Sequence, residues 1–264
     1  MWITGGDMES VLEQVVLRLR SAGCVFAEEE AAMLTGAAPT PEKLEELVER
    51  RAQGEPLEQV VGYAIFCGEK IHLRPGVFVP RVRSELLVRI AAENATNNTV
   101  VVDLCCGSGA LGKAVHRRVP GMALYAADSD PTAVACAKDN IGPENVFQGD
   151  LFAALPAHLK GGVNVLIANV PYVATRHIPF LPAEARDHEP REALDGGDDG
   201  LDVFRAVLKE AKTWLAPGGI LLSEITEAQI STATDVVRAT ALHPAIHIDE
   251  DLEATVVTAT ALNR

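Results

Sequence analysis

The chain has 264 residues, of which 48% are hydrophobic, so it can bury a substantial core as one large domain with or without a small companion. Its formal net charge is −14, from 23 basic and 37 acidic residues, which argues against direct binding of nucleic acid. Five cysteines without a Cys-x-x-Cys spacing argue against a disulfide framework and a zinc site, so we expect no bound metal.

No stretch approaches the roughly 18 consecutive apolar residues of a membrane-spanning helix. The start of the chain also lacks the basic and then apolar profile of a secretory signal. We therefore expect a cytoplasmic protein with no membrane partner.

The first part of the chain has helical periodicity. Apolar residues such as Val11, Val15 and Leu19 recur on one face, and two prolines near residue 40 separate helices. The acidic run at residues 28–30 predicts a solvated helical face. We predict a helical domain at residues 1–58 that binds a substrate or partner protein.

Residues 63–73 alternate between apolar and polar, and a Pro-Gly pair follows them, so we predict a β-hairpin linker at residues 59–80. From there the chain returns to helix at about residues 84–93. Residues 81–264 are then expected to form a second, larger domain.

The pattern of this last domain is strand, glycine turn and helix, repeated. We predict strands at 100–103, 124–128, 145–150, 163–168 and 220–224, a helix at 201–215, and a closing hairpin at 245–261. The expected fold class is α/β, a Rossmann-like, mainly parallel sheet with a closing antiparallel hairpin.

The turn after the first strand is rich in glycine. Gly107, Gly109 and Gly112 satisfy the Gly-x-Gly-x-x-Gly fingerprint of dinucleotide sites, with Asp128 in place as the ribose acid. However, Asp103 ends the strand before the glycines, where a carboxylate suits the cationic S-adenosylmethionine better than a pyrophosphate. A nicotinamide-dependent oxidoreductase remains the alternative from another class.

Suitable side chains follow four successive strands, and together they predict a site for S-adenosyl-L-methionine. We therefore expect residues 81–264 to be a catalytic domain that binds S-adenosylmethionine. The expected cofactor-binding residues are Asp103, Cys105, Cys106, Gly107, Ser108, Gly109, Asp128, Ser129, Asp150, Leu151 and Asn169. The two adjacent cysteines are interpreted as small packing residues and not as a redox pair.

The fourth strand ends in Asn169-Val170-Pro171-Tyr172, and we predict that these four residues form the catalytic turn. An amide oxygen and a backbone carbonyl can accept the two hydrogens of a planar amino group, while tyrosine packs on its face. Alone, such a tetrapeptide is usually an ordinary turn, so its significance depends on the glycine loop upstream.

These motifs, with the linker segments 55–62 and 77–81 and the Glu-Pro-Arg segment that begins at Glu189, resemble the HemK/PrmC family of class I methyltransferases. The resemblance implies transfer of a methyl group to the side-chain N5 of the glutamine in the Gly-Gly-Gln motif of peptide chain release factors. It also implies that Arg81 and Glu189 fix or enclose this glutamine.

The chain departs from the family pattern at several positions. Val170 replaces the first proline of Asn-Pro-Pro-Tyr, Cys105 replaces a glycine, and residues 82–85 read Val-Arg-Ser-Glu where the family has Pro-Glu-Thr-Glu. These changes suggest a divergent branch. The alternatives are therefore an enzyme that methylates an exocyclic amine of adenine or a small molecule, and a catalytically silent S-adenosylmethionine-binding protein.

Overall fold

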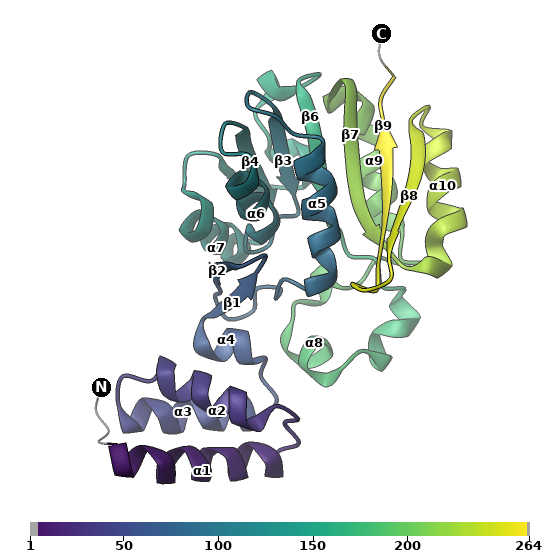
Figure 1. The fold of residues 1–264 in the computed structure, drawn as a ribbon. Coiled ribbons are helices and arrows are strands. Elements are labelled where there is room, and N and C mark those ends of the chain that lie inside the picture. The colour runs from purple at the N-terminus through teal and green to yellow at the C-terminus, as the bar shows by residue number, and fades with distance from the viewer. Residues whose placement is uncertain (1–4, 263–264) are drawn as a thin grey trace.

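The computed structural model describes residues 5–262, which form a helical domain and a larger sheet domain joined by a β-hairpin (Figure 1). The helical domain contains α1 (Gly5–Ser21), α2 (Ala27–Ala37), α3 (Pro41–Ala52) and α4 (Leu57–Val61). The hairpin consists of β1 (Tyr63–Phe66) and β2 (Glu69–His72). The predicted domain limit at residue 58 thus falls inside α4.

Local signals explain where the third helix begins. The Thr40 side chain accepts a hydrogen bond from the Lys43 amide at 3.2 Å, and Pro41 occupies the first helical position. The helices then bury Leu19, Leu34 and Leu47 against each other in a small core of their own.

The predicted solvated face at residues 28–30 is wrong for Glu30. This side chain is buried and forms two hydrogen bonds with the guanidinium of Arg51, at 2.6 and 3.1 Å. A buried carboxylate requires such a partner. Because Arg51 lies in α3, the pattern of charges around residues 28–30 could not predict this contact.

The sheet of the larger domain has seven strands in the order β5-β4-β3-β6-β7-β9-β8. The first five strands in this order, β5, β4, β3, β6 and β7, pair in parallel. Strand β9 is antiparallel to both β7 and β8. The bounds are β3 (Val100–Leu104), β4 (Ala123–Asp128), β5 (Val146–Gln148), β6 (Val163–Ala168), β7 (Leu215–Ile225), β8 (His243–Asp249) and β9 (Ala254–Thr260). The predicted mainly parallel sheet with a closing antiparallel hairpin is therefore confirmed.

Helices cover both faces of this sheet. One face packs on α5 (Glu85–Glu93) and α6 (Ala110–Arg118), with α7 (Pro131–Ile141) beside β4 and β5. The other packs on α9 (Asp202–Trp214) and α10 (Ile230–Ala239). Strand β7 begins at Leu215, earlier than predicted, because residues before the glycine turn already pair with β6 through an irregular register.

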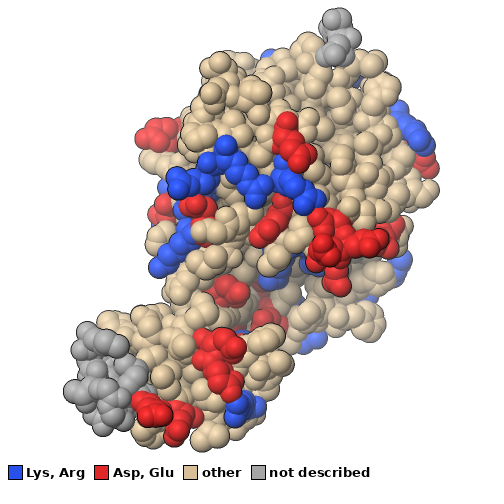
Figure 2. Space-filling view, viewed as in Figure 1, with Lys and Arg blue, Asp and Glu red and all other residues tan. Residues whose placement is uncertain are grey.

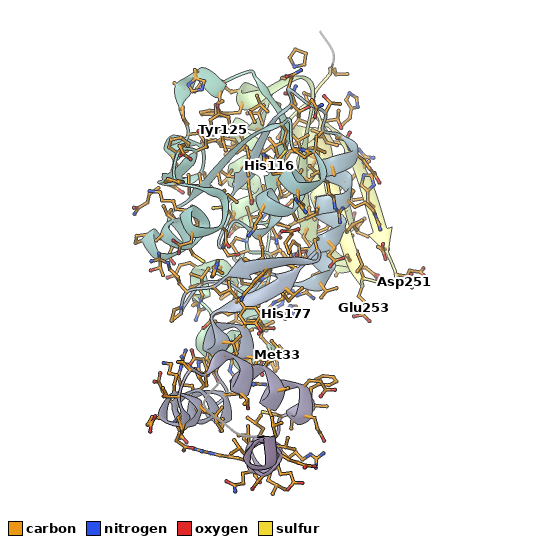
Figure 3. The ribbon with its side chains drawn as sticks, turned by 60° about the vertical axis from the view of Figure 1, so that its left-hand side comes forward. Met33, His116, Tyr125, His177, Asp251 and Glu253 are labelled. Carbon is orange, nitrogen blue, oxygen red and sulfur yellow. The ribbon has the colours of Figure 1, made fainter. Side chains whose placement is uncertain are left out.

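The strand arrows of β3 and β7 point toward the helical domain, so the carboxyl edge of the sheet faces it (Figure 1). The short helix α8 (Ala183–His188) lies in the same region. Figure 3 shows His177, from the segment that follows β6, and Asp251 and Glu253, from the β8–β9 turn, at this end of the domain, with Tyr125 far above them.

Charged side chains of both signs occur on the face seen in Figure 2, and no broad basic surface covers it. Between residues 5 and 262, no helix is long and apolar enough to cross a membrane.

Candidate active site

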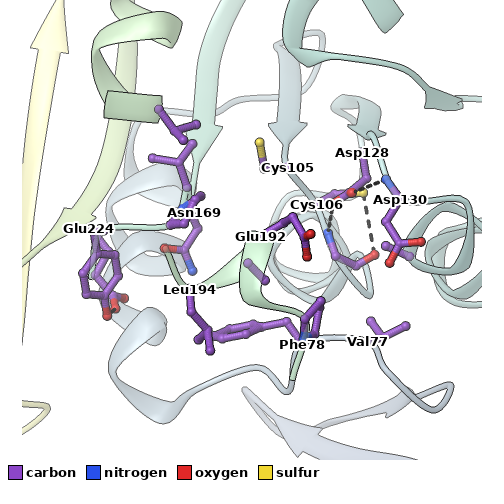
Figure 4. Close-up of a pocket in the computed structure, with 18 of the residues that line it drawn as sticks. Val77, Phe78, Cys105, Cys106, Asp128, Asp130, Asn169, Glu192, Leu194 and Glu224 are labelled. Carbon is purple, nitrogen blue, oxygen red and sulfur yellow. Dashed lines mark hydrogen bonds between the residues drawn. The ribbon is translucent and has the colours of Figure 1, made fainter. Parts of the chain in front are cut away.

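A cavity of about 910 Å³ opens at the carboxyl ends of β3, β4, β5 and β6. It brings together most of the residues that the sequence predicts for the site. Its walls include Arg81, Cys105, Cys106, Gly107, Ser108, Asp128, Ser129, Asp150, Leu151, Asn169, Val170, Pro171 and Tyr172. Asp128 and Asp130 lie on one side of it and Asn169 and Glu224 on the other (Figure 4).

The glycine loop is fixed by the carboxylate of Asp128 at the end of β4. One oxygen accepts the Gly107 amide at 2.9 Å, and the other accepts the Asp130 amide at 3.0 Å. Gly109 has a φ of 77°, and a Cβ there would lie 3.3 Å from Ala137 of α7. The loop therefore passes close to α7 in a conformation that favours glycine.

Three predicted site residues do not line the cavity: Asp103, Gly109 and Glu189. Asp103 is fully buried beneath the loop, where one carboxylate oxygen accepts the Gly112 amide at 2.9 Å. The other oxygen has no hydrogen-bond partner among the described residues. Burial raises the pKa of Asp103 to about 7, and the nearby Asp128 carboxylate adds to this increase.

The two adjacent cysteines face the cavity but are not activated thiols. Burial, and then the carboxylates of Asp103 and Asp128, raise the pKa of both, for Cys105 to about 12. A reactive cysteine requires the opposite shift. The interpretation of these residues as packing groups is consistent with this environment.

The turn after β6 is held by side chains from two other segments. Asn169 donates through its Nδ2 to the Ser84 hydroxyl at 3.4 Å, while its Oδ1 is buried without a partner among the described residues. Ser84, in the 3₁₀ turn Val82–Ser84, donates to Glu224 of β7 at 2.8 Å. The Tyr172 hydroxyl donates to the same carboxylate.

Sequence reasoning missed Ser84 and Glu224 as site residues. Both line the cavity and both are buried. Glu224 also lies 3.2 Å from the guanidinium of Arg83. An acidic residue at the end of a strand next to β6 was the only available signal, because the contacts join residues about 140 positions apart.

On the side away from the cavity, Gln229 and the segment 195–201 form hydrogen bonds with the backbone of Tyr172 and Val173. The Gln229 amide donates to the carbonyls of Tyr172 and Asp199, each at 2.9 Å. The Gly196 amide donates to the Val173 carbonyl at 2.8 Å. Residues 169–172 thus lie between the segment 195–201 and the cavity.

Arg81 and Glu189 form an ion pair at 2.5 Å. Glu189 is buried and also accepts the Val79 amide at 3.0 Å. Burial raises the pKa of Glu189 above its ordinary value, although the Arg81 guanidinium opposes this increase. Only Arg81 lines the cavity, so Glu189 contacts it indirectly, through Arg81 and the linker.

The residues of this site fit S-adenosylmethionine. Asp128 has lone pairs left for ribose hydroxyls, and Asp150 and Leu151 supply an acceptor and an apolar wall. The unpaired oxygen of Asp103 lies under the loop, where a cationic cofactor would favour the ionised carboxyl. No group of three or more His, Cys, Asp or Glu within residues 5–262 has a geometry that would hold a metal ion.

The Methyltransferase small domain family matches residues 69–184. A methyltransferase of known structure from Pyrococcus furiosus superposes with a TM-score of 0.54 at 14% identity, over 74% of this chain and 90% of that chain. A release factor glutamine methyltransferase of Bradyrhizobium diazoefficiens is 31% identical, over 90% of this chain and 89% of that protein.

A third similar protein is the 4-amino-L-phenylalanine/4-methylamino-L-phenylalanine methyltransferase of Streptomyces pristinaespiralis, which is 34% identical over 77% of this chain and 72% of its own length. The fold and the cavity, with these similarities, define a class I methyltransferase that uses S-adenosyl-L-methionine. Within this class, the chain belongs to the HemK/PrmC family, the family of the release factor glutamine methyltransferases.

Proposed function

We propose that the enzyme methylates the side-chain amide nitrogen of a protein glutamine, namely that of the Gly-Gly-Gln motif of a peptide chain release factor. Two findings support this assignment. Several similar proteins carry the name release factor glutamine methyltransferase. The observation that carries the chemistry is that Asn169, a residue of the cavity wall, has a buried side-chain oxygen with no hydrogen-bond partner among the described residues.

Bound S-adenosylmethionine supplies a methyl group on a sulfonium, which is a strong electrophile. Asp128 would hold the ribose, Asp150 and Leu151 the adenine, and residues 105–108 the methionine part. The remaining work of the protein is to present the acceptor nitrogen.

An amide nitrogen is a poor nucleophile because its lone pair is delocalised into the carbonyl. The Asn169 Oδ1 and the Val170 carbonyl would accept the two amide hydrogens and orient the nitrogen toward the cofactor side. No described residue donates a hydrogen bond to that Val170 carbonyl. These two oxygens would keep the acceptor nitrogen aligned with the methyl group that the bound cofactor would supply, so positioning would supply most of the acceleration.

The acceptor glutamine would enter between the two domains. Glu184 of α8 lines the cavity and forms an ion pair with Arg51 of the helical domain at 2.7 Å. We propose that residues 1–58 dock the partner protein, that residues 59–80 hold the two domains together, and that Arg81 encloses the glutamine. The corresponding place of action is the cytoplasm, with no membrane partner and no direct contact to nucleic acid.

A second candidate acceptor is a small aromatic amine. The relative from Streptomyces pristinaespiralis is named for such a substrate and is as similar to this chain as the release factor enzymes are. Both acceptors present an amino group to the same turn.

The test is methyl transfer from labelled S-adenosylmethionine to three acceptors: a release factor, the same factor with its Gly-Gly-Gln glutamine replaced by alanine, and 4-amino-L-phenylalanine. We expect label only in the first. Asn169→Ala should lower kcat at least about a hundredfold while the cofactor still binds. Label in the altered factor, or only in the small amine, would overturn the assignment.

A further inference from the structure

The side chains behind Asn169 form a chain of hydrogen bonds with one defined direction. Glu224 is contacted by the Arg83 guanidinium, the Ser84 hydroxyl and the Tyr172 hydroxyl. Burial, and then the Glu224 carboxylate, raise the pKa of Tyr172 well above its ordinary value, so the phenol keeps its proton and donates. The Glu224 carboxylate accepts hydrogen bonds from both hydroxyls and forms an ion pair with Arg83.

This direction fixes the role of Ser84. A hydroxyl has one hydrogen, and Ser84 uses it toward Glu224 at 2.8 Å. Toward Asn169 the same oxygen can then only accept. The Asn169 Nδ2, at 3.4 Å, is the group that it accepts.

The consequence reaches the acceptor nitrogen. The two ends of an asparagine amide are nearly the same in shape, and their hydrogen-bond partners decide which way they point. With Nδ2 turned to Ser84, the Oδ1 is left as the end that can accept. In the reverse orientation, two oxygen lone pairs would face each other at Ser84, and an NH₂ donor would be left for the substrate, which is itself a donor.

On the basis of the proposed function, we propose that Glu224 and Ser84 are positioning residues that set the orientation of the Asn169 amide. They touch neither cofactor nor acceptor in this role. Glu224 acts on Ser84, and Ser84 acts on Asn169. The turn is thereby kept as an acceptor for the substrate NH₂ before the substrate arrives.

The experiment compares kcat, KM for the acceptor and the dissociation constant for S-adenosylmethionine in Ser84→Ala, Glu224→Gln and the double variant. We expect kcat to fall tenfold to a hundredfold in each single variant, with cofactor affinity within about twofold of wild type. The double variant should be no slower than the slower single variant, because both changes act through Asn169. Ser84→Thr keeps the hydroxyl and should restore kcat to within about threefold.

Ser223→Ala is the matched control. Ser223 is also buried and donates one hydrogen bond, at 2.8 Å, to the Ala168 carbonyl beside the turn. The substitution Ser223→Ala removes the same atom as Ser84→Ala but does not change the hydrogen-bond partners of Asn169. The kcat of this variant should therefore stay near that of wild type even if its stability falls. Unchanged kcat in Ser84→Ala and Glu224→Gln would overturn the proposal, as would additive losses in the double variant or an equal loss of kcat in Ser223→Ala.

Failure of the proposed function would give a different result. In that case the wild-type enzyme itself would transfer no methyl group to the glutamine, and the measurements above would be made with the acceptor that does take the label.

Discussion

Gly200 lies so close to Tyr172 that a Cβ at position 200 would be 2.2 Å from the Tyr172 carbonyl oxygen. Its φ of 82° also lies in the left-handed region that favours glycine. The same carbonyl accepts the Gln229 amide, which a Cβ on Gly200 would also approach, at 2.4 Å. The turn that carries Asn169 is therefore shaped from behind by a segment about 30 residues further along the chain.

This contact predicts that Gly200→Ala inactivates the enzyme more than it unfolds it. The new methyl group must displace Tyr172 or its own backbone, so we expect kcat to fall at least about tenfold and the free energy of unfolding to fall by about 1–3 kcal/mol. Steady-state kinetics and urea unfolding check both effects.

Gly36→Ala is the control for this substitution. Gly36 lies in α2, and no atom lies within 4 Å of a Cβ built there. Alanine should stabilise the helix by about 0.5–1 kcal/mol with unchanged kinetics. A Gly200→Ala enzyme as active as Gly36→Ala would contradict the role given to the contact.

The sequence was sufficient to predict those cavity residues that belong to a motif at the carboxyl end of a strand. Asp128 ends β4, Asn169 directly follows β6 and Gly107 lies in the loop after β3, and parallel strands bring their carboxyl ends to one edge. Ser84 and Glu224 could not be predicted in the same way, since their contact depends on how the linker crosses the sheet edge. Asp103 shows a second limit, because a strand end predicts the edge of the sheet and not whether the side chain faces the cavity or the interior.

Asp103 gives a prediction about pH. Its pKa of about 7 lies above the ordinary value near 3.9, so the folded protein holds this proton more tightly than the unfolded chain does. The stability of the cofactor-free protein should therefore decrease as the pH rises from about 4 to about 7. Binding of a cation favours the ionised carboxyl, so affinity for S-adenosylmethionine should rise with pH up to about 7 and then level off, by at most about tenfold per pH unit.

Calorimetric titration between about pH 5.5 and 8.5 measures this dependence. Asp103→Asn keeps an oxygen that can accept the Gly112 amide and removes the titration, so its affinity should be lower at high pH and nearly independent of pH. A slope equal to that of wild type in this variant would assign the titration to another group, such as Asp128, whose pKa burial also raises.

The cysteines give a prediction about thiol reactivity. All five are free, and burial raises the pKa of each, to about 11 for Cys67 and about 12 for Cys105. Since the thiolate is the reactive form, none should react with iodoacetamide at pH 7.5 as fast as free cysteine does. Mass spectrometry should find five labelled sites after unfolding. Rapid labelling of native Cys105 or Cys106 would instead support a chemical role for this pair.

Arg51 gives a prediction about stability, because the helical domain is built around its buried ion pair. Only 9% of the Arg51 side chain and 10% of that of Glu30 are exposed, and Arg51 reaches Glu184 of α8 as well. Arg51→Ala leaves the Glu30 carboxylate buried without its partner and should reduce the free energy of unfolding by about 3–5 kcal/mol. The combined replacement Glu30→Leu and Arg51→Met removes both charges and should cost less than Arg51→Ala alone.

Arg20→Ala provides the exposed counterpart, because the ion pair of Arg20 with Glu28 is solvated on both sides. It should change stability by less than about 1 kcal/mol. Urea unfolding of the four proteins distinguishes the two kinds of pair. If Arg51→Ala lowered the free energy of unfolding no more than Arg20→Ala, the buried pair of Arg51 and Glu30 would stabilise the protein no more than a surface contact does. The contact of Arg51 with Glu184 would then not stabilise the packing of α8 against the helical domain.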